Sequence, residues 1–122
     1  METTDNKPIM LTLDRVQKAA RQAYDEGRLL FQNGRVERCG YAVRMGDKDC
    51  VCAIGAALPP SFAERYPWAN FANLQDLTSN RLVDCADFPE VSDIQRAHDD
   101  LCFSFEPPTK DEIDAFLALL EQ

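Results

Sequence analysis

The sequence lacks several features on which common functions depend. It contains a single histidine, which excludes a catalytic or metal site built from several histidines. It has neither a GxxxxGK[ST] loop nor a GxGxxG loop after a strand, the glycine-rich motifs that cradle phosphate groups. No apolar run approaches the roughly 20 residues that span a bilayer, and the N-terminal METTDNKP shows no signal-peptide pattern. We therefore expect a cytoplasmic protein with no membrane contact.

Positively charged residues are also scarce, and they are scarcest in the second half of the chain. The 122 residues carry 13 Lys and Arg against 21 Asp and Glu, a net charge of −8. Residues 1–61 carry about +1, whereas residues 62–122 carry about −9. An acidic half repels phosphate, so direct nucleic-acid binding is disfavoured, and it attracts a basic surface on another protein. Net negative charge also keeps a small protein soluble, and this interpretation stays open.

Length and hydrophobic periodicity predict one domain of the α+β class. We expect a flexible N-terminal tail at residues 1–10 and a single domain at residues 11–122. The fold predicted is helix-rich, with one short antiparallel β-hairpin at about residues 36–53 packed on about four to six helices.

Local signals place the predicted elements. An apolar stripe with Thr12 as N-cap predicts a helix that ends at Asn33-Gly34. Alternation through Cys39, Tyr41, Val43 and Met45 predicts the first strand of the hairpin. A short helix over AIGAAL and another from about residue 70 to 82 follow. S/T-x-x-E/Q capping boxes predict helix starts at Ser61–Glu64, Ser92–Gln95 and Thr109–Glu112. Asp87-Phe88-Pro89 also predicts the beginning of the helix that carries His98.

The segment DCVCAIGAAL, residues 49–58, holds two of the five cysteines and invites a chemical interpretation. Zinc binding would need Cys39, Cys50 and Cys52 with His98 or another cysteine, but a second close pair of ligands is missing. A nucleophilic Cys52 would need His98 as base, yet His98 falls on the apolar face of its own helix. We favour buried cysteines that fill a tight hairpin–helix interface, with Gly55 allowing a close approach. We predict no metal, no cofactor and no enzymatic activity.

Two short motifs carry a resemblance. CAIGAALP occupies residues 52–59 after the predicted strand, and IQRAHD occupies residues 94–99. Together they resemble small, uncharacterised phage and prophage proteins that carry a C-A-I-G-x-L-P type motif and a later L/I-Q-x-x-H-D element. The likeness covers roughly residues 36–100, and Cys50 and the second proline depart from the pattern. It implies a phage or mobile element in a bacterial host cell.

These observations favour a non-enzymatic phage or prophage accessory protein. We expect it to bind and inhibit a bacterial protein with a basic surface, such as a nucleic-acid-binding component of a defence system, in the manner of anti-CRISPR or anti-restriction proteins. The predicted contacts are acids of the last two helices, namely Asp93, Asp99, Asp100, Asp111, Glu112 and Asp114. The alternatives are a small zinc- or thiol-dependent protein using Cys39, Cys50, Cys52 and His98, and an acidic immunity protein that neutralises a basic toxin. A homodimer through Trp68 or Phe103 also stays open.

Overall fold

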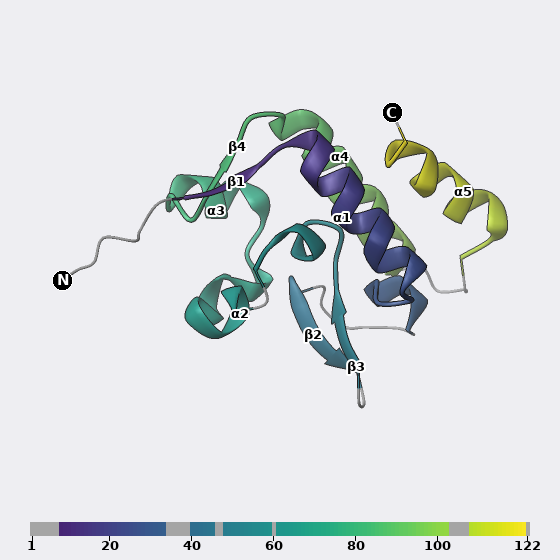
Figure 1. Ribbon diagram of the computed structural model, residues 1–122, viewed down its shortest axis with the longest axis horizontal. Helices are drawn as coiled ribbons and strands as arrows, with labels where there is room; N and C mark the ends of the chain where they lie inside the picture. The colour runs from purple at the N-terminus through teal and green to yellow at the C-terminus, as the bar shows by residue number, and fades with distance from the viewer. Residues whose placement is uncertain (1–7, 34–39, 46–47, 60, 103–107, 122) are drawn as a thin grey trace.

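The computed structural model describes residues 8–33, 40–45, 48–59, 61–102 and 108–121, and it confirms the α+β class (Figure 1). In chain order the elements, with short 3-10 helices labelled η, are β1 (Ile9–Leu11), α1 (Leu13–Asp25), η1 (Leu30–Gln32), β2 (Ala42–Met45), β3 (Lys48–Val51), η2 (Gly55–Ala57), α2 (Phe62–Arg65), η3 (Pro67–Phe71), α3 (Leu74–Ser79), β4 (Val83–Cys85), α4 (Phe88–Cys102) and α5 (Lys110–Leu119).

Helix α1 begins where the sequence predicts and ends earlier. The Thr12 hydroxyl accepts a hydrogen bond from the Arg15 N–H at 3.1 Å, which confirms Thr12 as the N-cap. The predicted end at Asn33-Gly34 is wrong, because Gly27 adopts a left-handed conformation with φ of 71°. Glycine adopts that conformation without a steric penalty, and it commonly terminates helices. The Arg28 N–H then donates to the Ala23 carbonyl at 2.8 Å and closes the last turn.

The strand pair β1–β4 was not predicted. Ile9 pairs with Val83 and Leu11 with Cys85 in parallel register, so Ile9 and Met10 belong to a strand rather than to the predicted tail of residues 1–10. A three-residue strand gives too short a pattern to recognise in the sequence, and its partner lies 74 residues further along the chain. Only the tertiary contact therefore identifies it.

The predicted hairpin is confirmed within the described residues. Strands β2 and β3 are antiparallel, with Val43 opposite Cys50 and Ala42 opposite Val51. Cys39 lies outside the described residues. The chain leaves the strand after Val51, so Cys52 is not on the same strand face as Cys50, contrary to the prediction.

The three capping boxes have different outcomes. At α5 both reciprocal bonds form, since Thr109 Oγ1 accepts from the Glu112 N–H at 3.2 Å and Glu112 Oε1 accepts from the Thr109 N–H at 2.9 Å. Ser61 precedes α2 but makes no capping bond through its side chain. The start predicted at Ser92 is wrong, whereas the start predicted at Asp87-Phe88-Pro89 is confirmed, because α4 begins at Phe88 and Pro89 suits a first helical turn. Helix α3 is also shorter than the predicted span of residues 70–82.

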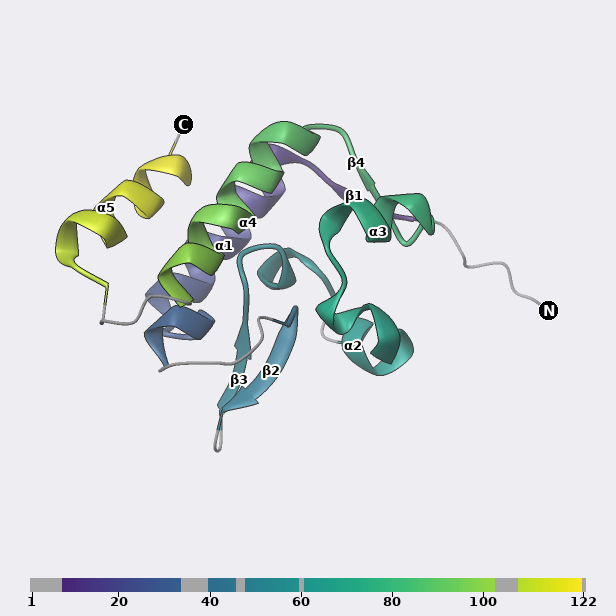
Figure 2. The ribbon, with the colours of Figure 1, turned by 180° about the vertical axis from the view of Figure 1, so that it is seen from behind.

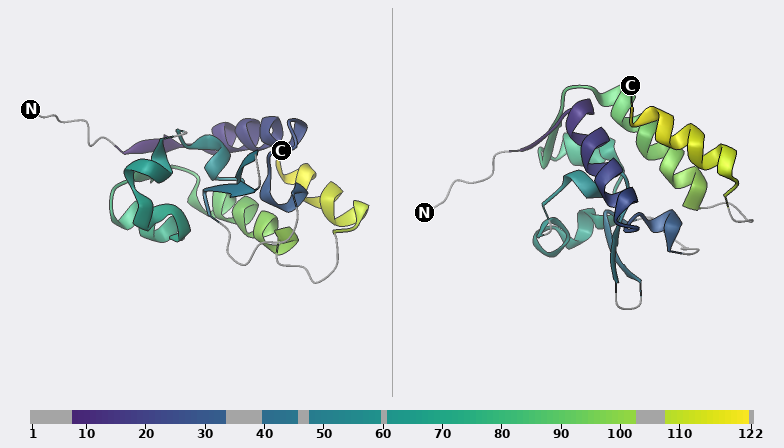
Figure 3. Two further views of the ribbon diagram at one scale, coloured as in Figure 1. Left: turned by 90° about the horizontal axis from the view of Figure 1, so that it is seen from below. Right: turned by 45° about the vertical axis from the view of Figure 1, so that its right-hand side comes forward.

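Helices α1, α4 and α5 form the largest packed layer. Helix α4 packs against both α1 and α5, and η2 packs against α1 (Figures 2 and 3). The hairpin β2–β3 projects from one side of this layer, next to α2 (Figure 1). Within the described part of the chain, no helix combines the length and the apolar character that crossing a membrane requires.

Candidate functional site

The segment of residues 49–58, here called the corner, is a strand-to-turn junction that is tightly packed. Cys52 Sγ accepts a hydrogen bond from the Gly55 N–H at 3.3 Å, and the Cys52 carbonyl accepts from the Ala56 N–H at 3.0 Å. A Cβ atom at Gly55 would lie 1.9 Å from the Tyr41 carbonyl oxygen. No side chain fits there, because the opposing atom belongs to the backbone. The predicted role of Gly55 in a close approach is therefore confirmed.

Gln95 ties the corner to α4. Its Oε1 accepts from the Ile54 N–H at 2.9 Å, and its Nε2 donates to Asp99 Oδ1 at 2.8 Å. The Asp99 side chain is 34% exposed, against 51% for Asp114 on α5. Asp99 also lines a cavity of about 300 Å³ together with Cys52, Gln95 and Arg96. Asp99 therefore helps to hold α4 against the corner, and its side chain is also partly exposed to solvent.

Among the described residues, Cys50, Cys52 and His98 form no common centre, although Cys102 Sγ lies 3.7 Å from His98 Nδ1 one turn along the same helix. Cys50 lines one cavity and Cys52 another. His98 is fully buried, with its ring 5.7 Å from that of Phe31 and 6.0 Å from that of Phe116, as its place on an apolar face predicts. Among the described residues, no group of three or more His, Cys, Asp or Glu side chains could hold a metal ion.

Two shifted pKa values reflect burial around these cysteines. The Tyr41 hydroxyl donates to the Ala72 carbonyl at 2.5 Å, and burial raises the pKa of Tyr41, with charges at Cys52 and Asp99 adding to the shift. Burial also raises the pKa of the Cys85 thiol, against a lowering by its hydrogen bond to the Asp87 backbone. Both groups are therefore held in their neutral forms, which does not favour a nucleophile at either position.

The remaining predicted acids lie on the outer faces of two adjacent helices. On α4, Asp93 and Asp100 are exposed and make no ion pair or hydrogen bond with a described residue, and Glu90 is exposed one turn earlier. On α5, Asp111 is exposed and likewise unpartnered among the described residues.

The other two acids of α5 have local partners. Asp114 pairs with Lys110 at 2.7 Å, and Glu112 belongs to the capping box. Helix α4, which carries Asp93 and Asp100, packs against α5, which carries the other acids, whereas Asp99 takes part in the link to the corner.

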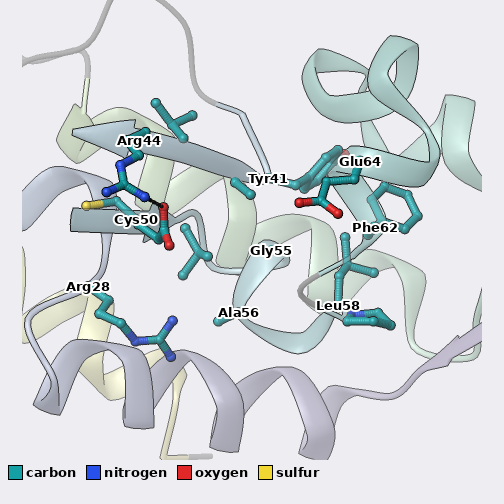
Figure 4. Close-up of a pocket in the computed structure, with 14 residues that line it drawn as sticks. Arg28, Tyr41, Arg44, Cys50, Gly55, Ala56, Leu58, Phe62 and Glu64 are labelled. Carbon is teal, nitrogen blue, oxygen red and sulfur yellow. Dashed lines mark hydrogen bonds and ion pairs between the residues drawn. The ribbon is translucent and has the colours of Figure 1, made fainter. Parts of the chain in front are cut away.

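A larger cavity, which the sequence did not indicate, lies between the hairpin and the end of α1 (Figure 4). Its volume is about 470 Å³. Charged side chains from distant segments meet there, with Arg28 after α1, Arg44 on β2 and Glu64 on α2. Arg44 and Asp49 already pair at 3.1 Å. No spacing in the sequence predicts such a site, because each of these charged residues lies on or next to a different element.

One exposed aromatic residue bears on the dimer prediction. Trp68 is 59% exposed, as an aromatic contact between two copies would require, whereas Phe103 lies outside the described residues.

Comparison of the chain with protein-family models, with curated proteins and with solved structures returned no match. The resemblance to small phage proteins accordingly stays a prediction.

Proposed function

We propose that this chain is a non-enzymatic binding protein that uses the outer faces of α4 and α5, here called the acidic face, to occupy a basic surface of a bacterial protein. The supporting observation is the packing of the two helices that carry the acids. Together α4 and α5 contain seven acidic and two basic residues, and four of the acids (Glu90, Asp93, Asp100 and Asp111) are exposed without a partner among the described residues. Such a surface attracts cationic proteins and repels nucleic acid itself.

The basic surface most compatible with this charge is one that normally binds nucleic acid. Its occupation would inhibit a component of a bacterial defence system, in the anti-CRISPR or anti-restriction manner, from within the cytoplasm of the host cell. The phage-like motifs at residues 52–59 and 94–99 support that context. The corner needs no chemistry in this proposal, since its role is to hold the hairpin against the helices.

A pull-down with the full chain from bacterial lysate, followed by mass spectrometry, identifies the partner. Two charge-reversal variants then test the surface, Asp93→Lys with Asp100→Lys on α4, and Asp111→Lys with Asp114→Lys on α5. We expect each pair to slow association with the partner about 10-fold at low salt, with a smaller effect at high salt because salt screens exposed charges.

A matched control separates local charge from net charge. Asp14→Lys with Asp25→Lys reverses two exposed acids on α1, and it changes the net charge of the chain by the same amount. We expect this variant to associate at nearly the wild-type rate. If all three pairs slow association equally, only the overall charge matters. If none does, the acidic face has no part in binding and the proposal is wrong.

A further inference from the structure

Arg28 lines the larger cavity, and its guanidinium group pairs with Glu26 through only one of its three nitrogens. Its Nε donates to Glu26 Oε1 at 2.6 Å, while its two terminal amino groups make no hydrogen bond with a described residue. The backbone around it is held firmly, because the Arg28 carbonyl accepts from the Val51 N–H at 3.0 Å. Figure 4 shows the guanidinium end directed toward Ala56, into the space below the hairpin. The side chain is 37% exposed, so a ligand can reach it.

Glu64 presents the opposite charge at the other end of the same cavity. It belongs to the four-residue helix α2, is exposed, and makes no ion pair or hydrogen bond with a described residue. In Figure 4 its carboxylate lies beside Tyr41 and Phe62, away from Arg28. Arg44 and Asp49, which also line the cavity, pair with each other, so they add no net charge to it.

Apolar side chains join the two charged ends. Val51, Leu58, Pro59 and Phe62 also line the cavity, and Gly55 and Ala56 add small residues to its wall. A volume of about 470 Å³ lies in the range of small-molecule sites. A mainly apolar lining with a few polar groups is also typical of such sites, where the polar groups orient the ligand.

We propose that this cavity binds a short zwitterionic peptide, with its terminal carboxylate on the free amino groups of Arg28, its terminal amine on Glu64, and an apolar side chain against Leu58 and Phe62. The planar guanidinium suits a carboxylate, which it can bind through two parallel hydrogen bonds. The separated opposite charges select a ligand that is itself charged at both ends. This site is independent of the acidic face, since none of its lining residues lies on α4 or α5.

The test is a binding titration of the full chain with leucine-containing peptides of two, three and four residues. Each peptide is prepared in four forms: with both termini free, acetylated at the amine, amidated at the carboxylate, and blocked at both ends. Calorimetry gives the affinity, and changes in the amide NMR signals of Val51, Gly55 and Glu64 report on the site. We expect one peptide length to bind best with both termini free. Amidation should weaken it about 10-fold and acetylation about 3-fold, since Glu64 is the more exposed group.

Two variants assign the two ends of the ligand. Arg28→Gln should abolish the effect of amidation but keep that of acetylation, and Glu64→Gln should do the reverse. Arg21→Gln is a matched control, because Arg21 is paired with Asp25 and does not line the cavity. It should leave all affinities unchanged.

Three results would overturn the proposal. One is that no peptide shifts the amide signals of the cavity residues at 10 mM, a concentration about 10-fold above a millimolar Kd. Another is that the blocked peptide binds as well as the free one. The last is that the acetylated form binds as well as the free one in the wild-type chain, which would make the site an anion site and not a zwitterion site. A failure of this test would leave the acidic-face proposal untouched, because the two sites share no residue.

Discussion

Seven of the ten residues of the corner, from Asp49 to Leu58, are buried, whereas the charged side chains on the acidic face lie mostly in solvent. The corner is held by contacts in which a single atom matters, such as the approach of Gly55 to the Tyr41 carbonyl. The acidic face has no such close contact, since most of its acids have no partner among the described residues.

This difference teaches where stability and binding reside. Adding or removing one buried atom lowers the free energy of unfolding, because the interior is close-packed and cannot relax fully. Exposed charges contribute little to folding, since water solvates them equally well in the unfolded chain. Substitutions in the corner should therefore change the free energy of unfolding, and substitutions on the acidic face should change association. The predictions that follow test this division, from the largest expected effect to the smallest.

Gly55→Ala should have the largest effect on stability. The added Cβ would meet the Tyr41 carbonyl oxygen at 1.9 Å, so β2 or the corner must move. We expect a loss of about 3 kcal/mol or more in the free energy of unfolding, measured by urea denaturation. Gly27→Ala is a useful comparison, because φ of 71° there imposes only backbone strain of about 1 kcal/mol. An equal effect of the two substitutions would contradict the steric explanation.

Cys52→Ala should destabilise the protein by about 1 kcal/mol or more, because it removes a buried sulfur that accepts from the Gly55 N–H. Binding to the partner should persist at low temperature, where the variant remains folded. The measurement combines thermal denaturation with the pull-down described above. A variant that is fully stable and yet fails to bind would show that the thiol has a chemical role.

Tyr41→Phe should lower stability at neutral pH by about 1 kcal/mol, since the Ala72 carbonyl loses its donor. It should also change the pH dependence. Burial raises the pKa of Tyr41 in the folded state, so the contribution of its protonated form is fully present below about pH 10, the ordinary pKa of tyrosine, and is lost as the pH rises further.

The wild-type protein should therefore lose stability above about pH 10 more steeply than the Tyr41→Phe variant. Urea denaturation between pH 8 and about pH 11 measures this difference. Tyr66→Phe keeps Tyr41 in place and should retain the steep decline. Parallel curves for wild type and Tyr41→Phe would show that the buried hydroxyl does not govern the alkaline transition.

The adjacent acids Asp99 and Asp100 should give the smallest effects, and unequal ones. Asp99→Ala removes the acceptor for Gln95 Nε2 and should destabilise the protein by about 1 kcal/mol. Asp100→Ala touches no described partner and should stay within about 0.5 kcal/mol of wild type. Chemical denaturation of both variants makes the comparison. Equal losses would mean that Asp99 contributes nothing to the link between α4 and the corner.

Local signals in the sequence were enough for much of the fold. The N-caps Thr12 and Thr109 form as predicted, because a capping hydroxyl acts on backbone only a few residues away. The β-hairpin and the burial of His98 follow from alternation and helical spacing in the same way. The end of α1 was misplaced, since Gly27 fits the apolar stripe and is also the residue that terminates the helix.

Contacts between distant segments could be identified only from the tertiary structure. The parallel pairing of β1 with β4 and the bond from the Ile54 N–H to Gln95 each depend on how elements far apart in the chain pack. The same holds for the cavity in which Arg28 and Glu64 face a shared space.

By itself, then, the sequence determined the approximate places of the hairpin and of most helices, the burial of His98, and the acidity of the second half, because these properties depend on short-range spacing and composition. The tertiary structure alone decided which acid-bearing helices pack together, which acid serves the packing of the corner, and which charged groups line a common cavity. Those outcomes depend on the relative placement of whole elements, and no local pattern of residues encodes that placement.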